Sequence, residues 1–166
     1  DTQNIRYNSE LGGGALLDAG AYTIKATQFM MGDGFVVKAA NLNTSKEMNV
    51  DIFGGIYMQN KLGEFAELSF GFDNFYQCNY EIWGSKGKII ATRAFTAAPG
   101  FEPIIIVEKQ DNVESIKLPA DDHFYNILTH IIKCIKLKDF ESENLQNLQQ
   151  ADNIRQVVDL AFKYSY

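Results

Sequence analysis

The fold is decided by residues 35–59, FVVKAANLNTSKEMNVDIFGGIYMQ, where the sequence pattern changes from helical to extended. Both ends of this stretch, FVVKAANLN (35–43) and VDIFGGIYMQ (50–59), are apolar or alternating over the length of a strand. Similar segments follow at short intervals, at residues 64–73, 77–83, 88–93, 104–109 and 113–118. The pattern therefore predicts about seven strands in succession.

The breaks between these strands are short and rich in turn residues. Residues 60–63 (NKLG), 84–87 (GSKG) and 110–112 (QDN) have the composition of β-hairpin turns. Parallel neighbours need connections of roughly a dozen residues or more, so the sequence predicts antiparallel pairing.

Helical periodicity flanks the strands on both sides. Residues 13–31 repeat apolar side chains at helical spacing before the first strand. After the last strand, Asp121 or Asp122 can cap a helix that includes residues 124–135, and residues 145–164 form a third helical pattern. We therefore predict an α+β fold, an open-faced, mostly antiparallel β-sheet with the helices packed on one face.

The composition indicates one ordered globular domain of 166 residues, of which 46% are hydrophobic. A net charge of −6 argues against non-specific nucleic-acid binding. No apolar run reaches the ~18 residues of a membrane span, and we expect a cytoplasmic protein. Cys78 and Cys134 are too few and too scattered for a disulfide framework and lack metal-ligand spacing. We predict buried free thiols and no metal site.

The predicted sheet carries more large apolar side chains than one face can bury. Three helical segments cannot cover both faces of so many strands, and an exposed apolar face of that size normally marks an interface. We therefore predict a homo-oligomer, at least a dimer, formed through the open sheet face. The side chains that carry this prediction are Phe53, Ile56, Tyr57, Phe65, Phe70, Phe72, Tyr80 and Trp83.

A candidate site lies in residues 11–32, LGGGALLDAGAYTIKATQFMMG, where Asp18 and Tyr22 are four residues apart. On one helix face their Cβ atoms would be about 5–6 Å apart. Tyr22 could donate a proton to a substrate oxygen while Asp18 accepts from substrate hydroxyls, or the two could be a buried acid and a phenol at the edge of the core. A phenol needs a nearby cation to act as an acid at neutral pH, and Lys25 lies too far along the helix.

Several neighbours are weaker candidates, each with an ordinary alternative. The N–H groups of Gly13 and Gly14 could bind an anion of a cofactor, although close packing of the helix start is the favoured interpretation. Arg6 with Tyr7 could bind a phosphate or stack on a ring, or Arg6 could form a surface ion pair. His123 could face a ligand, although a solvent-exposed histidine is the favoured interpretation.

The sequence resembles the Gfo/Idh/MocA family, the glucose–fructose oxidoreductase and inositol dehydrogenase group. Residues 10–32, ELGGGALLDAGAYTIKATQFMMG, resemble the family signature GGGxLxDxGxH/Y, and residues 80–90, YEIWGSKGKII, are similar to its second recurring stretch. The resemblance implies that residues 1–166 are the C-terminal substrate-binding and oligomerisation domain of an NAD- or NADP-dependent enzyme. It places the Rossmann domain and the catalytic lysine outside these residues, which explains the missing cation.

The resemblance also implies roles for the candidate residues. Asp18 falls on the substrate-site acid and Tyr22 on the catalytic His-or-Tyr position, with Arg6, Tyr7 and His123 as weaker pocket candidates. A tyrosine there resembles the branch that acts on nucleotide-linked keto-sugars and the dihydrodiol dehydrogenase branch. We expect hydride transfer between nicotinamide and a sugar carbinol or ketone, and no activity or tight NAD(P) binding by this chain alone. The alternative is a non-catalytic sugar-binding or assembly module of the same fold.

Overall fold

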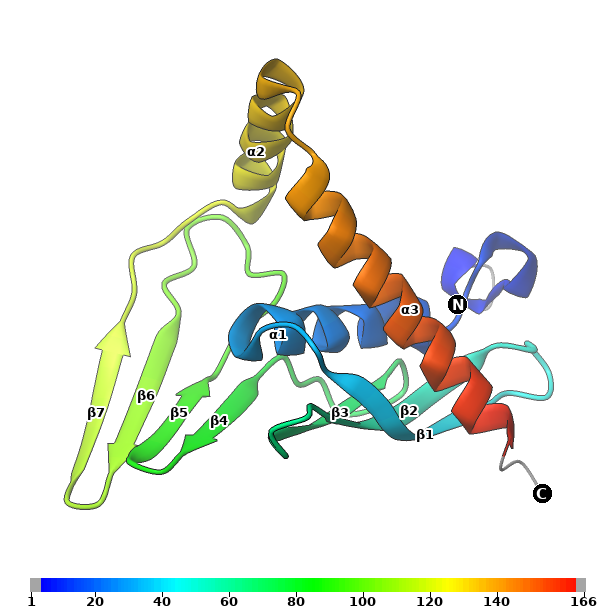
Figure 1. Ribbon diagram of the computed structural model, residues 1–166, viewed down its shortest axis with the longest axis horizontal. Helices are drawn as coiled ribbons and strands as arrows, with labels where there is room; N and C mark the ends of the chain where they lie inside the picture. Colours follow the sequence, from blue (N-terminus) through cyan, green and yellow to red (C-terminus); the bar gives the residue numbers. More distant parts are fainter. Residues whose placement is uncertain (1–3, 164–166) are drawn as a thin grey trace. The chain divides into compact units, whose positions relative to one another are not determined.

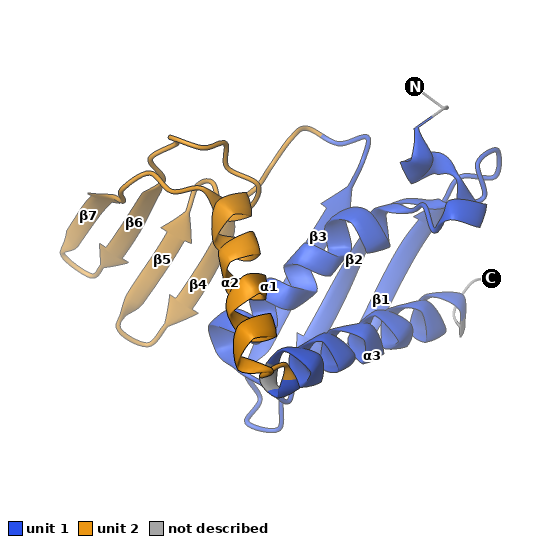
Figure 2. Cartoon of the chain, turned by 90° about the horizontal axis from the view of Figure 1, so that it is seen from above, with its two compact units in different colours: residues 1–74, 141–166 blue, residues 75–140 orange. Residues whose placement is uncertain are grey.

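The structure is a computed structural model that describes residues 4–163 (Figure 1). The chain divides into two compact units, residues 1–74 with 141–166 and residues 75–140 (Figure 2). Each unit contains its own antiparallel sheet, of three strands in the first and four in the second.

In the first unit, two helices lie on one face of a sheet with the strand order β1-β2-β3 (Figure 2). Along the chain its elements are the 3₁₀ turns η1 (Ile5–Tyr7) and η2 (Ser9–Leu11), the π-helix η3 (Leu16–Gly20), α1 (Ala21–Met31), β1 (Val36–Thr44), β2 (Asp51–Gln59), β3 (Phe65–Gly71) and α3 (Glu141–Lys163). The core lies between the helices and the sheet and consists of Ala15, Leu16, Ile24, Phe35, Val37, Ile56, Met58, Phe70 and Val157.

Side chains of β2 and β3 alternate between this core and the opposite side of the sheet, which we call the open face. Ile56 and Met58 are buried in the core together with Phe70. Phe53 and Phe65 are 42% and 55% exposed on the open face. The strand register, in which Phe53 pairs with a glycine of β3 and Phe65 with the last residue of β2, places both rings on that face. The predicted open-faced sheet is confirmed in this unit.

The second unit is a meander of four strands followed by a helix. Its strands are β4 (Tyr80–Gly84), β5 (Gly87–Ala91), β6 (Ile104–Lys109) and β7 (Asn112–Lys117), hydrogen-bonded in that order, and its helix is α2 (His123–Leu137). Of the two predicted caps, Asp122 accepts a hydrogen bond from the N–H of Tyr125 at 3.0 Å. Asp121 instead accepts from the side-chain amide of Asn126 at 2.8 Å.

The α+β class and the antiparallel pairing are confirmed, but the strands form two hydrogen-bonded sheets rather than one. The ladder is interrupted before β4, which begins at Tyr80 and not at residue 77. The carbonyl of Cys78 accepts from the N–H of Ala94 at 2.6 Å, and its sulfur accepts from the N–H of Phe95 at 3.2 Å. These bonds tie the segment to the loop after β5, so it does not extend the strand. Cys78 is half-buried and Cys134 is buried, and both are free thiols.

The helices also differ from the prediction at their N-termini. Gly14 has a φ of +123°, so the first helix begins at Leu16 and not at residue 13. Its first segment is the π-helix η3, where the N–H of Leu16 donates to Asp51 Oδ2 at 2.6 Å. The third helix begins at Glu141, four residues before the predicted start.

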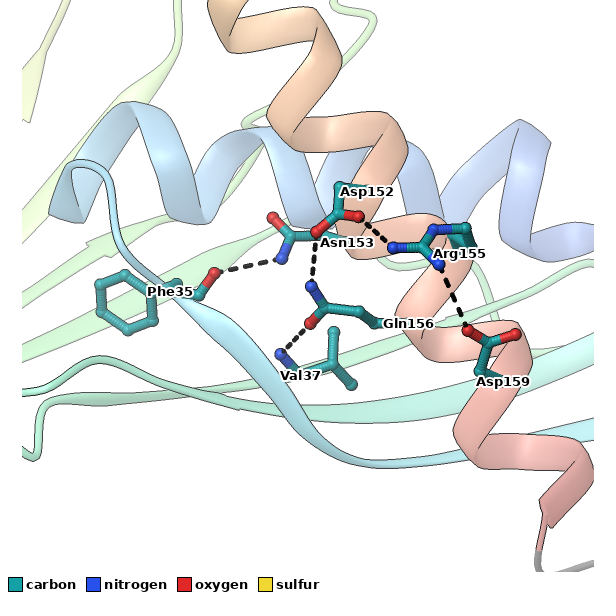
Figure 3. Close-up of polar contacts among 7 residues, drawn as sticks. All are labelled: Phe35, Val37, Asp152, Asn153, Arg155, Gln156 and Asp159. Carbon is teal, nitrogen blue, oxygen red and sulfur yellow. Dashed lines mark hydrogen bonds and ion pairs between the residues drawn. The ribbon is translucent and has the colours of Figure 1, made fainter.

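Amide side chains of α3 satisfy the backbone at the outer edge of β1 (Figure 3). Asn153, 2% exposed, donates from Nδ2 to the carbonyl of Phe35 at 3.1 Å. Its Oδ1 accepts from Nε2 of Gln28 on α1 at 3.0 Å. Gln156 Oε1 accepts from the N–H of Val37 at 3.0 Å. These bonds anchor α3 and satisfy two backbone groups at the start of the edge strand β1.

Candidate active site

Asp18 and Tyr22 lie on consecutive segments of the first helix, Asp18 in η3 and Tyr22 in the first turn of α1. The side chain of Asp18 is 39% exposed and Tyr22 is 49% exposed. Asp18 is not buried, which argues against the alternative of a buried acid, and the roles of Asp18 and Tyr22 stay predictions. A π-helical turn inside an α-helix is rare and occurs frequently at functional sites.

Packing against β3 accompanies the π-helical turn. Gly20, its last residue, lies against the ring of Phe70, and a Cβ at this position would come within 3.1 Å of that ring. A Cβ would also lie 3.0 Å from the side chain of Leu16, so either the Leu16 and Phe70 side chains or the helix would have to shift slightly. The glycine therefore lets the segment that carries Asp18 sit directly on the core.

Arg6 forms an ion pair with Asp18. Its Nε donates to Asp18 Oδ2 at 2.8 Å. The hydrogen bond to Asp18 raises the pKa of the Arg6 guanidinium, and the negative charge of Asp18 raises it further. Of the alternatives open for Arg6, the structure shows the ion pair, and it places the guanidinium on the carboxylate one turn before Tyr22.

The glycine run positions the backbone of the loop that carries Arg6. The N–H of Gly14 donates to the carbonyl of Arg6 at 2.9 Å, and the N–H of Gly13 donates to the carbonyl of Asn8 at 2.8 Å. A Cβ on Gly13 would lie 2.5 Å from the carbonyl oxygen of Arg6. The absence of a side chain at residue 13 therefore allows the two backbone segments to approach.

A carboxylate of the chain itself lies at the helix start. Asp51 accepts from the N–H of Leu16, and a Cβ on Gly14 would collide with the same carboxylate. Gly13 and Gly14 already donate their N–H groups within the chain. These contacts favour the packing interpretation of both glycines over anion binding. Asp51 is a neighbour that sequence reasoning missed, because it lies 35 residues from Leu16 and no local pattern links them.

The ring of Tyr7 anchors the same loop. It packs edge-to-face on Phe72, just beyond β3, with ring centroids 5.4 Å apart. Its proposed contact with substrate stays a prediction. His123, the exposed first residue of α2, belongs to the second unit, and its role also stays a prediction.

Within residues 4–163, no group of His, Cys, Asp and Glu side chains is arranged to hold a metal ion. Across the same described range, none of the helices combines the length and the apolar character that crossing a membrane requires.

Residues 1–90 match the family model of the GFO/IDH/MocA C-terminal domain. The chain belongs to the GFO/IDH/MocA family. The signature that carries Asp18 and Tyr22 lies inside the matched region, and so do Arg6 and Asp51.

The relatives within this family include sugar reductases. The chain is 36% identical over 133 residues to the dTDP-3,4-didehydro-2,6-dideoxy-α-D-glucose 3-reductase of Saccharopolyspora spinosa, covering 80% of this chain and 40% of that protein. It is 30% identical over 153 residues to the enzyme of the same name from Streptomyces antibioticus, covering 92% and 45%. The chain thus spans less than half the length of these relatives.

A solved structure with the same fold is that of KijD10, a 3-ketoreductase from Actinomadura kijaniata, in complex with NADP and TDP-benzene. It superposes with a TM-score of 0.83 at 31% identity, covering 95% of this chain and 47% of that one. The expected α+β domain of this family is therefore confirmed.

Proposed function

We propose that the intact protein reduces the keto group of a dTDP-linked deoxysugar with NADPH, and that residues 1–166 form its C-terminal substrate-binding and oligomerisation domain. The observation that carries the proposal is the half-exposed Tyr22, one turn from an acid held by Arg6, in a chain whose relatives are named as dTDP-sugar 3-reductases. A nucleotide-sugar ketone is the substrate class that fits both this arrangement of side chains and the names of the relatives.

In the proposed reaction, NADPH bound elsewhere in the intact protein would supply the hydride that the ketone carbon receives and would leave as NADP⁺. The carbonyl oxygen receives a proton from the phenol of Tyr22, so that the C=O double bond becomes a C–H bond and an O–H bond. Tyr22 regains its proton from solvent, which its exposure permits. Asp18 accepts a hydrogen bond from a sugar hydroxyl and orients the ring, since one of its oxygens is held by Arg6.

The described residues do not fit a dinucleotide. Both sheets are antiparallel, and the N–H groups of Gly13 and Gly14 are used within the chain. A dinucleotide fold needs parallel strands and helix N-termini that face the pyrophosphate. We therefore assign the cofactor, NAD or NADP, to a part of the intact protein outside this chain, and we expect this chain alone to be inactive.

The test uses the intact protein with dTDP-3,4-didehydro-2,6-dideoxy-α-D-glucose and NADPH deuterated at the transferred position. We expect NADPH oxidation and one deuterium at the reduced sugar carbon. The Asp18→Asn variant should raise KM more than it lowers kcat. If the sugar binds without any NADPH oxidation, the alternative of a non-catalytic sugar-binding or assembly module replaces the enzyme.

The open face supports the proposal of a homo-oligomer. Phe53 and Phe65 are exposed on it, and the ring of Tyr57 contacts Phe65 with centroids 5.8 Å apart. An apolar cluster on the uncovered side of a sheet is a typical subunit interface. We also propose that the protein is cytoplasmic, as expected from its sequence.

A further inference from the structure

Arg6 is held in place by its backbone, independently of its side chain. Its N–H donates to Asn4 Oδ1 at 3.0 Å, and its carbonyl accepts from Gly14 at 2.9 Å. The neighbouring ring of Tyr7 packs on Phe72. The loop therefore places the guanidinium of Arg6 next to Asp18 on the helix, although the two residues are 12 positions apart in the sequence.

The position of the Arg6 guanidinium affects the charges that surround Tyr22 when it releases its proton. Proton donation by Tyr22 leaves a phenolate one turn from the carboxylate of Asp18, and two like charges at that spacing repel each other. The guanidinium of Arg6 opposes both charges, since it is hydrogen-bonded to Asp18 at 2.8 Å and Asp18 lies one helical turn before Tyr22.

We propose that Arg6 is a positioning residue for proton transfer, which neutralises and orients Asp18 so that Tyr22 can release its proton beside it. This inference rests on the proposed function of Asp18 and Tyr22. Arg6 acts through these two side chains and not through a bond to the substrate.

A second exposed arginine of the same unit provides the contrast. Arg155 pairs with Asp152 three residues away on α3, at 2.6 Å, and both side chains are largely exposed. Local surface pairs of this kind contribute little to stability. Arg6 and Arg155 thus make similar ion pairs, but only Arg6 makes its pair beside the candidate catalytic phenol.

The test is a double-mutant cycle in the intact protein, with Arg6→Gln, Asp18→Asn and the double variant, and with Arg155→Gln as the matched control. We expect Arg6→Gln to lower kcat by about 10- to 100-fold with little change in melting temperature, because the backbone bonds of the loop remain. Arg6→Lys should recover part of the loss. In the Asp18→Asn background, Arg6→Gln should lower kcat by a smaller factor than in the unmodified protein, since the carboxylate next to Tyr22 is already gone and only the charge of the phenolate remains.

Three results would overturn the inference. One is a kcat for Arg6→Gln equal to that of Arg155→Gln. Another is a loss of kcat on Arg6→Gln that has the same size in the unmodified protein and in the Asp18→Asn variant. The last is a raised KM with unchanged kcat, which would make Arg6 a substrate-binding residue. None of these touches the proposed function, which fails separately if Tyr22→Phe retains the turnover of the unmodified protein.

Discussion

The amide of Asn153 connects three elements of the first unit, and replacing it tests how that unit is held together. Asn153 is 2% exposed, accepts from Gln28 on α1 and donates to the carbonyl of Phe35 next to β1. Asn153→Ala removes both hydrogen bonds and leaves a buried donor on Gln28 and a buried carbonyl without these partners.

The expected loss of stability follows from those two bonds. Each net hydrogen bond contributes about 0.5–1.5 kcal/mol, and leaving a buried polar group unsatisfied costs about 1–3 kcal/mol. Because the two terms overlap, we expect Asn153→Ala to lower the free energy of unfolding by about 2–4 kcal/mol. With a urea dependence of roughly 2 kcal/mol/M, the midpoint of unfolding should fall by about 1–2 M.

The assay is urea denaturation of the chain followed by far-UV circular dichroism. The matched control is Asn147→Ala, the same substitution at an exposed position of α3, where the side chain lies 3.5 Å from the amine of Lys25. The control should move the midpoint by less than about 0.25 M. If Asn153→Ala moves it no further than Asn147→Ala, the hydrogen bonds of Asn153 to Gln28 and to the Phe35 carbonyl (the second drawn in Figure 3) do not anchor α3 as described.

Three further perturbations test separate parts of the structure. Gly13→Ala should displace the loop that carries Arg6, because the new Cβ would meet the Arg6 carbonyl, and should lower the kcat of the intact protein without loss of the fold, as measured by kinetics and circular dichroism. Phe65→Lys should convert an oligomer to a monomer in sedimentation velocity, whereas a monomeric unmodified protein at micromolar concentration would refute the interface. Hydrogen bonds from Arg155 and Gln156 lower the pKa of Asp152, so its contribution to stability is present at neutral pH and is lost as the pH falls through that lowered pKa. Asp152→Asn should therefore weaken the acid-side dependence of the unfolding midpoint, and an unchanged dependence would contradict the assignment.

Local patterns in the sequence were sufficient to predict the fold class and most strands. The alternation of β2 and β3 around Ile56 and Phe70 predicted a sheet with one covered face, because strand periodicity depends only on neighbouring residues. The break between the two sheets was not predictable in this way. It depends on the bonds between Cys78 and the loop at residues 94–95, which are distant in sequence.

The candidate site shows the same division. Asp18 and Tyr22 could be singled out as candidates from their spacing, since both belong to one continuous segment, whereas their roles came from the family resemblance and stay predictions. The π-helical turn and the contact of its first residue with Asp51 were not recognisable in this way, because no local pattern marks the turn and Asp51 lies 35 residues from Leu16. The pairing of Arg6 with Asp18 was one of several open alternatives, and only the folded loop selects it.

The most direct test of the central claim is the turnover of Tyr22→Phe in the intact protein, with NADPH and a dTDP-linked 3-keto-sugar. This substitution removes one hydroxyl from a half-exposed ring. Tyr125→Phe, at a 66% exposed position of α2, is the matched control. We predict that Tyr22→Phe lowers kcat by about 100- to 10,000-fold while NADPH binding and the control's turnover are unchanged. Turnover of Tyr22→Phe equal to that of Tyr125→Phe would contradict the assignment of Tyr22 as the proton donor.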